Sequence, residues 1–232
     1  MGKLPQISHL EVWIMTSAEL EMRLQLLKAA IAHVPFDGWS SSTLSLAATD
    51  CNIADANWMQ YFPGGLVEVV SLYGILADDE MVAAYHEIDE VPVPTHLKVR
   101  TLVMIRLHQA GKHKETVRRS LGFLAQPRHA ALASKMLYRT VDTIWRTVGD
   151  MSTDYNFYTK RATLAAIYSA TMLAFLGDDT KDLSKTEAFL DRRLTDISRI
   201  PKATKPAQAF MSGLASAIGR TAGMMRRRPF RR

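Results

Sequence analysis

The sequence predicts an all-α fold of nine or ten helices, and three observations lead to it. Apolar residues recur at intervals of three and four along most segments, which is the spacing of one helix face. No segment shows the apolar and polar alternation of a β-strand. Clusters of Pro, Gly, Ser, Asn and Asp separate the periodic segments, as helix ends and turns do.

The size and composition are typical of a single globular domain that folds in water. The chain has 232 residues, of which 47% are hydrophobic and 22% are charged, and these values argue against a disordered chain. The longest apolar stretch without a charge, Ala162 to Gly177, is 16 residues long. A membrane-spanning helix needs roughly 20, so we interpret this stretch as a buried core helix. The first residues show no export, transit or lipidation signal.

The first third of the chain has a helix-turn-helix outline. We expect a helix over Ser17 to His33, followed by Pro35 and Gly38. Its apolar face is formed by Leu20, Leu24, Leu27 and Ile31. Two short helices then follow, over residues 43–50 and 53–62, with a turn at residues 50–52.

Longer helices are expected in the rest of the chain. Their ranges are 66–87, 95–111, 113–125, 128–148, 154–175 and 184–200. The cap-forming residues of 149–154 mark one start, and Gly177 to Thr180 marks one end. We expect three parts: a helix-turn-helix-like part with a long connecting helix over residues 1–92, a helical part over 93–200, and a basic tail over 201–232.

Charge is distributed unevenly along the chain. Residues 201–232 hold eight Lys or Arg and no acid, whereas residues 1–200 hold 21 basic and 23 acidic side chains. No Lys or Arg occurs between Lys28 and Lys98, where ten acids lie. Such a stretch repels phosphate, so we expect no DNA binding through the helix-turn-helix outline and interpret its apolar residues as core.

The basic tail has the pattern of an amphipathic membrane-binding helix. The residues assigned to membrane contact are Phe210, Met211, Leu214, Ile218, Arg220, Arg226, Arg227 and Arg228. Three glycines weaken this helix in water by roughly 1 kcal/mol each relative to Ala, and an anionic membrane surface offsets that cost. A basic arm for RNA or DNA, a helix packed on the body, and a disordered tail are the alternatives.

Catalytic and metal-binding motifs are missing from the sequence. The single cysteine, Cys51, lies among acids that raise its thiol pKa, and it can form no intramolecular disulfide. The seven histidines are scattered, and none follows a glutamate at the Glu-x-x-His spacing of helical di-iron sites. We therefore expect a protein that is not an enzyme and has no metal or cofactor.

Two segments resemble known families. The frame Leu26 to Ala30, Gly38, Leu44 to Ala48 and Trp58 to Phe62 resembles the DNA-binding half of TetR-type regulators, which implies a TetR-like helical bundle with a C-terminal ligand pocket. The run Val141 to Tyr168, continued by Phe189 to Arg193, closely resembles the COQ-nine type of ubiquinone biosynthesis accessory lipid-binding proteins. These keep the TetR-like fold without acting as repressors.

The second resemblance implies a non-enzymatic protein that binds a polyprenyl quinone intermediate, an isoprenoid lipid. It implies docking on membranes through the C-terminal helix and presentation of the lipid to the di-iron demethoxyubiquinone hydroxylase. The residues expected to line the lipid cavity are Leu102, Ile105, Met136, Leu137, Ile144, Leu164, Ile167, Tyr168, Met172 and Phe175. Periodicity cannot separate a cavity wall from a filled core. The sequence alone favours an ordinary core, and the resemblance reverses that preference in favour of the cavity.

A patch of aromatic and charged residues is expected to contact the hydroxylase. It comprises Asp150, Asp154, Tyr155, Phe157, Tyr158 and Arg161. Aromatic rings beside arginine are typical of interface hot spots. The family often has Trp where this chain has Phe157. TetR-like proteins usually form homodimers, so we expect one here.

Two alternative functions stay open: a TetR-type transcriptional regulator that senses an apolar ligand, and an interaction scaffold without a ligand. The expected location is the bacterial cytoplasm, peripheral on the cytoplasmic membrane. For a mature eukaryotic form it would be the matrix side of the inner mitochondrial membrane.

Overall fold

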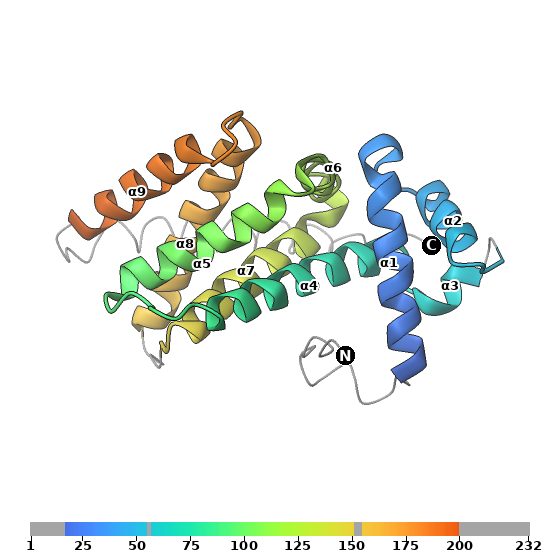
Figure 1. The fold of residues 1–232 in the computed structure, drawn as a ribbon, viewed down its shortest axis with the longest axis horizontal. Helices are drawn as coiled ribbons and strands as arrows, with labels where there is room; N and C mark the ends of the chain where they lie inside the picture. The colour runs from blue at the N-terminus through green and yellow to red at the C-terminus, as the bar shows by residue number, and fades with distance from the viewer. Residues whose placement is uncertain (1–16, 55–56, 151–154, 200–232) are drawn as a thin grey trace, which may run out of the picture. The chain divides into compact units, whose positions relative to one another are not determined.

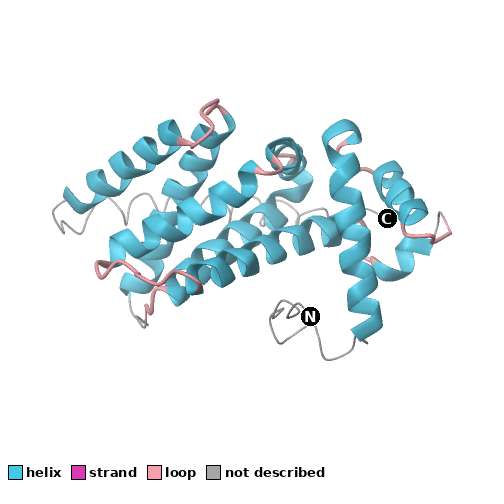
Figure 2. Ribbon diagram, in the orientation of Figure 1, coloured by secondary structure: helices cyan, strands magenta, loops and turns pink. Residues whose placement is uncertain are grey.

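The computed structural model describes residues 17–54, 57–150 and 155–199 (Figure 1). Helices and connecting loops make up this described part, and it contains no strand, so the all-α prediction is confirmed (Figure 2). The chain divides into two compact units, Met1–Asp191 and Arg192–Arg232. The second unit begins inside the last helix and is described only as far as residue 199.

Three helices form the N-terminal group of the first unit: α1 (Ser17–Asp37), α2 (Ser41–Asp50) and α3 (Trp58–Tyr61). Their apolar faces meet in a shared core. Its fully or almost fully buried members include Leu26, Leu27, Ala30, Val34, Leu44, Ala47 and Phe62. The Ser40 hydroxyl caps α2 by accepting a hydrogen bond from the Thr43 amide at 3.1 Å.

Two of these helices differ from the prediction in length. Helix α1 runs four residues further, through Pro35, because a proline in the last turn removes one hydrogen bond and leaves the turn intact. The helix ends where Gly38 takes a φ of +66°. Helix α3 is shorter than the predicted 53–62, because Asn52 adopts a φ of 57° and the Ile53 amide turns back to the Ala48 carbonyl.

The long helix α4 (Leu66–His86) leads from the N-terminal group and lies beside α5 (Thr95–Gly111) and α7 (Ala130–Thr147) (Figure 1). Helix α6 (Lys114–Leu124) packs against α1, and a short 3₁₀ turn, Pro127–His129, precedes α7. Helix α8 (Tyr155–Leu176) packs on α7. The side chains that α5, α7, α8 and α9 bury most deeply are Leu102, Leu107, Ile144, Leu164, Phe175 and Leu190.

The first turn of α9 (Ser184–Arg199) is organised by one buried carboxylate. Asp178 is 3% exposed and accepts hydrogen bonds from the amide and hydroxyl groups of both Thr180 and Thr186. Burial acts to raise the pKa of Asp178, but these four hydrogen bonds outweigh it and hold that pKa well below its usual range. The Lys114 ammonium donates to the Asp178 carbonyl, which ties the loop to α6.

An ion-pair network joins α9 to α5 within the first unit. The Arg100 guanidinium lies 2.5 Å from the Asp191 carboxylate and 2.6 Å from the Glu187 carboxylate. These hydrogen bonds, with Asp191 first, raise the pKa of Arg100 despite its partial burial. Because each pair is partly exposed, we expect the network to orient α9 more than to stabilise the fold.

Candidate functional site

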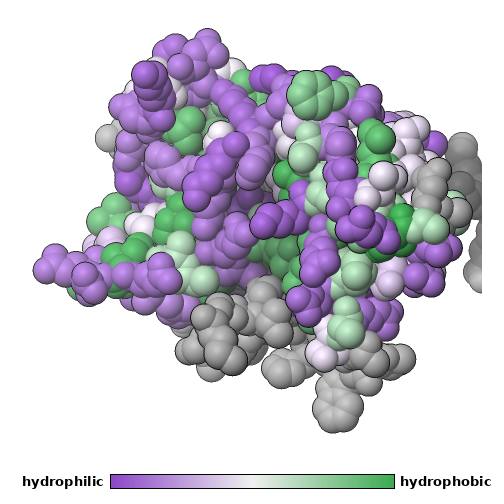
Figure 3. Space-filling model, turned by 45° about the vertical axis from the view of Figure 1, so that its right-hand side comes forward, coloured by the Kyte–Doolittle hydropathy of each residue, from purple (hydrophilic) through white to green (hydrophobic). Residues whose placement is uncertain are grey.

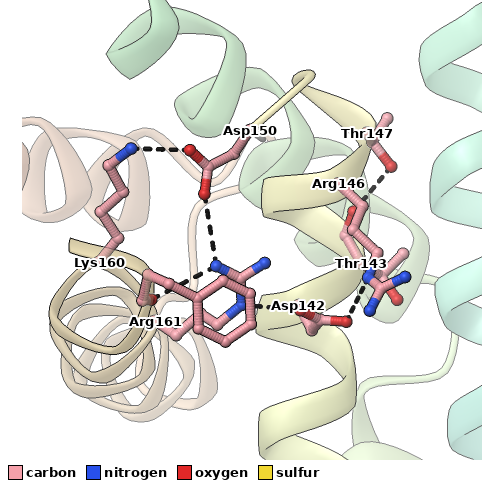
Figure 4. Close-up of polar contacts among 8 residues, drawn as sticks. Asp142, Thr143, Arg146, Thr147, Asp150, Lys160 and Arg161 are labelled. Atoms are coloured by element: carbon pink, nitrogen blue, oxygen red, sulfur yellow. Dashed lines mark hydrogen bonds and ion pairs between the residues drawn. The ribbon is translucent and has the colours of Figure 1, made fainter. Parts of the chain in front are cut away.

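Four charged side chains meet where the end of α7 faces the start of α8. Figure 4 shows Asp142, Asp150, Lys160 and Arg161 pointing toward one another across the two helices. Arg161 Nε donates to Asp142 Oδ1 at 2.7 Å, and its Nη1 donates to Asp150 Oδ2 at 3.3 Å. Lys160 Nζ donates to the other Asp150 oxygen at 2.7 Å. We call these four residues the α7–α8 ionic cluster.

Local backbone geometry brings Asp150 into this cluster. Helix α7 ends in a turn at Gly149, whose φ of +84° suits glycine. The Asp150 amide then donates to the Trp145 carbonyl at 3.0 Å, so the chain folds back over the last turn of α7. This places the Asp150 carboxylate, 7% exposed, against the first turns of α8.

Arg161 is the centre of the cluster and is nearly enclosed, with 3% of its surface exposed. Its guanidinium carbon lies 3.4 Å from the centre of the Phe157 ring, and its Nη1 also reaches the Phe157 carbonyl at 3.3 Å. Two carboxylates and an aromatic face thus compensate for the removal of this charge from water. The arrangement fixes the rotation of α8 relative to α7.

The cluster presents an aromatic side chain to the surface. The rings of Phe157 and Tyr158 meet edge to face, with centres 5.1 Å apart. Tyr158 is 63% exposed, whereas Phe157 is half-buried against Arg161. An exposed tyrosine is a suitable anchor for a protein partner, because a tyrosine side chain has few rotatable bonds and loses little entropy when it is covered.

The structure gives different positions to the six residues predicted for partner contact. It brings Asp150, Phe157, Tyr158 and Arg161 together, with only Tyr158 largely exposed. Asp150 and Arg161 are enclosed, so within this arrangement they hold the surface in place. Asp154 lies outside the described residues, and Tyr155 opens α8 without a described side chain.

Sequence reasoning missed Asp142 and Trp145 in this site. Asp142 lies 19 positions before Arg161, and its local signal is the (i, i+4) pair with Arg146 at 2.6 Å. Trp145 lies beneath the Lys160 ammonium, which is 5.4 Å from the centre of its ring. Its indole nitrogen is buried and has no hydrogen-bond partner among the described residues.

The ten residues predicted to line a lipid cavity lie on α5, α7 and α8. Seven of them are buried: Leu102, Ile144, Leu164, Ile167, Tyr168, Met172 and Phe175. The others, Ile105, Met136 and Leu137, are half-buried. Both a filled core and a cavity wall require this burial, so the lipid contact stays a prediction.

A second polar cluster lies within the interior formed by α4, α5 and α7. Asp78 is 2% exposed and binds two guanidinium groups, those of Arg106 at 3.5 Å and Arg139 at 3.1 Å. The Thr140 hydroxyl donates to the same carboxylate at 2.9 Å. We call these residues the Asp78 cluster. Two cations and a hydroxyl thus satisfy the Asp78 carboxylate, as its burial requires.

Asp79, the residue after Asp78, has one carboxylate oxygen that is not satisfied in this way. Its Oδ2 atom is buried and has no hydrogen-bond partner among the described residues, and the same holds for Arg139 Nη2. Burial and the neighbouring charge of Asp78 raise the pKa of Asp79 to about 6, while the positive charge of Arg139 acts in the opposite direction.

The surface of the described part carries separate apolar side chains. On the face drawn in Figure 3, hydrophobic residues form separate areas within a largely hydrophilic surface. The most exposed large apolar residues include Phe36, Val93, Tyr158 and Leu173. None of the described helices combines the length and apolar composition that crossing a bilayer requires. The eight residues predicted for membrane contact lie outside the described part.

Two further sequence expectations concern metal and thiol chemistry. In the described ranges, no three His, Cys, Asp or Glu residues are arranged to hold a metal ion. Cys51 is a free thiol whose pKa is raised, first by burial and then by the charge of Asp50. The predicted direction of this shift is confirmed. A raised pKa lowers the thiolate fraction and hence the reactivity of the thiol.

The sequence comparisons all relate this chain to the COQ9 proteins. The sequence model of the COQ9 family matches residues 130–201, which include the α7–α8 ionic cluster. The chain is 27% identical to the ubiquinone biosynthesis protein COQ9 of Xenopus tropicalis over 212 residues, covering 86% of this chain and 66% of that protein. The human COQ9 protein gives the same identity and coverage. The Drosophila melanogaster protein is 30% identical, over 77% of this chain and 56% of its own length.

All three relatives carry the word mitochondrial in their names. The chain spans about two thirds of the length of the frog and human proteins. The predicted resemblance to the COQ9 proteins is confirmed.

The fold has a counterpart among solved structures. The crystal structure of a TetR transcriptional regulator from Nitrosomonas europaea superposes with a TM-score of 0.61. The match covers 76% of this chain and 97% of the regulator at 18% sequence identity. The predicted TetR-like all-α fold is therefore confirmed.

Proposed function

We propose that this chain, a homologue of the COQ9 proteins, acts in ubiquinone biosynthesis as a lipid-binding accessory protein. In this role it takes a polyprenyl quinone intermediate from the membrane and presents it to the di-iron demethoxyubiquinone hydroxylase. The observation that carries the proposal is the relationship to the COQ9 proteins over 86% of the chain. The match of the COQ9 family model to residues 130–201 agrees with it.

The physical need for such a protein follows from the solubility of the substrate. A polyprenyl chain is nearly insoluble in water, so an enzyme outside the bilayer reaches it only through an apolar carrier. The ten apolar residues on α5, α7 and α8 offer a lining of suitable chemistry, because aliphatic and thioether side chains adapt to an isoprenoid chain. Their burial fits this assignment and fits a filled core equally, so the assignment rests on the relationship to the COQ9 proteins.

Contact with the enzyme is assigned to the α8 surface beside the α7–α8 ionic cluster. Tyr158 is exposed and is held through Phe157 and Arg161, which gives a partner a preformed anchor. We expect the hydroxylase to cover this tyrosine. We expect the buried charges of the α7–α8 ionic cluster to limit the motion of this surface and so to lower the entropy cost of binding.

Membrane docking is assigned to the basic tail, residues 201–232. Apolar residues at helical spacing followed by arginines suit an anionic bilayer surface. The names of the relatives say mitochondrial, which supports a mitochondrial location. The matrix side of the inner membrane stays a prediction. The bacterial location and the homodimer stay predictions.

Hydroxylase turnover on membrane-bound substrate tests the proposal. The full chain is added to the purified hydroxylase and anionic vesicles that contain demethoxyubiquinone. We expect faster turnover with the chain than without it, and no gain when a detergent-soluble, short-chain substrate replaces the membrane-bound one. Equal turnover with and without the chain on vesicles would contradict the proposal.

Transcriptional regulation is the second candidate, and the TetR-like fold is the observation that favours it. The charge distribution argues against it, because the stretch between Lys28 and Lys98 holds ten acids and no Lys or Arg. Helix α3 is also only four residues long, which leaves few side chains to reach base edges. A salt-dependent mobility shift of DNA fragments by the purified chain would favour the regulator.

A further inference from the structure

Basic side chains dominate the part of the chain that follows the acidic stretch. Residues 91–141 hold ten Lys or Arg and a single acid, Glu115. Two of the arginines are enclosed in the Asp78 cluster, and Arg100 pairs with α9. Five of the others are exposed, on α6, beside its two ends or early in α7: Lys112, Arg118, Arg119, Arg128 and Lys135. Exposed positive charge therefore surrounds α6.

The two arginines of α6 are held in place on its exposed side. Glu115 lies 2.7 Å from Arg118 Nη1 and 3.2 Å from Arg119 Nε. Arg118 also donates to the Leu176 carbonyl at 3.1 Å, and Arg119 donates to the Pro35 carbonyl at 3.2 Å. About half of each arginine side chain still faces solvent. Oriented cations of this kind lose little entropy when they meet an anionic surface.

The contact of Arg119 with Pro35 brings an exposed aromatic ring to the same side. The next residue, Phe36, lies at the end of α1 and is 79% exposed. Gly122 and Ala125 follow Arg118 by one and two helical turns, and both are small and exposed. A Cβ at Gly122 would meet nothing within 4 Å. We call the following set the α6 basic surface: Phe36, Lys112, Arg118, Arg119 and Arg128.

The acids near this surface do not cancel its charge. Glu115 is shared by two arginines, and Asp37 is the exposed neighbour of Phe36. The loop between α8 and α9, which contacts α6, carries equal numbers of exposed acids and lysines: Asp179, Asp182, Lys181 and Lys185. The surface therefore keeps a net positive charge beside a large apolar ring.

We propose that the α6 basic surface is a second membrane contact, through which the folded body lies on an anionic bilayer with Phe36 inserted among the lipid headgroups. The cations meet lipid phosphates, and the ring leaves water. This inference rests on the proposed function, in which the basic tail already holds the chain at the membrane. It adds the side of the body that faces the bilayer.

The exposed phenylalanine favours a membrane over a nucleic acid as the occupant. Phosphate contacts require only the cations, whereas a phenylalanine ring has no hydrogen-bonding group and gains most from an apolar medium. Val93 is similarly exposed, at 87%, but it lies beside the exposed acids Asp89 and Glu90. An anionic bilayer repels that side of the body, so only one of the two apolar side chains should reach lipid.

Spin labels at these two positions test the orientation directly. A nitroxide is attached to Phe36→Cys or to Val93→Cys in the full chain, with Cys51→Ser to leave one thiol. The chain is bound to vesicles of phosphatidylcholine and phosphatidylglycerol, and power saturation measures access of oxygen and of a water-soluble nickel chelate. On binding, we expect the label at position 36 to gain access to oxygen and lose access to nickel. The label at position 93 should stay accessible to nickel.

Charge substitutions test the cations with a matched control. Lys112 and Arg128 are exposed and lie outside α6, so Lys112→Gln with Arg128→Gln leaves the packing of α6 intact. The control is Lys98→Gln with Arg146→Gln, which removes the same charge from the first turn of α5 and the last turn of α7, the ends away from α6. At low salt, we expect the first pair to weaken vesicle binding about tenfold and the control pair by less than about threefold.

The possible results separate this inference from the proposed function. Equal weakening by both pairs, or a bound chain whose label at position 36 stays as accessible to nickel as in solution, would overturn the α6 contact and leave docking by the tail intact. Unchanged vesicle binding by the first pair, with weaker binding of a single-stranded RNA probe, would assign the surface to nucleic acid and also overturn it. A full chain that does not bind vesicles would contradict both the α6 contact and docking by the tail.

Discussion

Arg161 places its guanidinium carbon 3.4 Å from the centre of the Phe157 ring while its Nε donates to Asp142 Oδ1 at 2.7 Å. One buried charge thereby connects an acid of α7 with an aromatic residue of α8. The exposed Tyr158 ring meets Phe157 edge to face, with the ring centres 5.1 Å apart. If Tyr158 contacts the proposed hydroxylase, we expect Arg161 to affect both stability and partner binding.

Removing Arg161 should strongly destabilise the fold. In Arg161→Gln, the Asp142 and Asp150 carboxylates lose their shared cation, although Lys160 still pairs with Asp150. Breaking a buried ion pair costs about 3 to 5 kcal/mol, and we expect a loss near the lower end of this range in urea unfolding.

Arg146→Gln is the matched control for this change. Arg146 binds the same Asp142, but its side chain is 74% exposed, so we expect a change of less than about 1 kcal/mol. Equal effects of the two substitutions would show that burial of Arg161 has no special role.

Replacing Tyr158 should weaken binding to the hydroxylase without unfolding the chain. Tyr158→Ala removes a ring that is 63% exposed, so stability should change by less than about 0.5 kcal/mol. If this ring is an interface hot spot, affinity for the enzyme should fall by tenfold or more in a surface-binding measurement.

Tyr138→Ala is the matched control, since Tyr138 is also exposed but lies on α7. The docking hypothesis is wrong if Tyr158→Ala and Tyr138→Ala both bind the hydroxylase as tightly as the unmodified chain does. Phe157→Ala is a less clean test, because this ring also packs on Arg161 and its loss should lower stability as well.

Replacing Asp79 should stabilise the protein above neutral pH. The pKa of this group is raised to about 6 in the folded state from 3.8, so the folded protein holds the proton more tightly than the unfolded chain. The ionised carboxylate therefore costs stability at every pH above about 6, and this cost disappears as the pH falls from about 6 to about 4.

In urea unfolding, Asp79→Asn should be more stable than the unmodified chain by roughly 1 to 2 kcal/mol at pH 7.5, allowing for solvent screening. The difference should shrink as the pH falls below about 6 and vanish below the unfolded value of 3.8, where Asp79 becomes protonated in both states. A difference that is independent of pH would contradict the raised pKa.

Deleting the basic tail should abolish binding to anionic vesicles. Residues 202–232 carry eight Lys or Arg, each worth about 1 kcal/mol near an anionic surface. We expect the full chain to float with anionic vesicles at low salt and the truncated chain to stay at the bottom of the gradient. Unchanged flotation after deletion would assign membrane binding to another part of the chain.

Much of the fold could be predicted because its signals are local. The boundaries of α5, α6 and α9 follow from proline, glycine and capping residues that lie within one turn of each end, and they agree with the prediction to within one residue. The end of α1 and the length of α3 could not be predicted. Both depend on the backbone conformation of a single residue, Gly38 or Asn52.

The candidate sites were predictable only in part, for a related reason. The aromatic pair of α8 is visible in the sequence, but its buried partner Asp142 comes from another helix 19 residues away. Asp79 gives no signal at all, since it is one of three consecutive acids on a helix. Only the packing of α4 against α7 shows that its carboxylate lacks a hydrogen-bond partner.

The most direct test of the account is to identify what the protein carries. The full chain is purified from its host without detergent, extracted with organic solvent and examined by mass spectrometry, beside an unrelated protein prepared identically. The account predicts an isoprenoid lipid with a quinone or phenol ring in the first extract and not in the second. An extract without any isoprenoid, from a chain that is folded and still binds the hydroxylase, would contradict it.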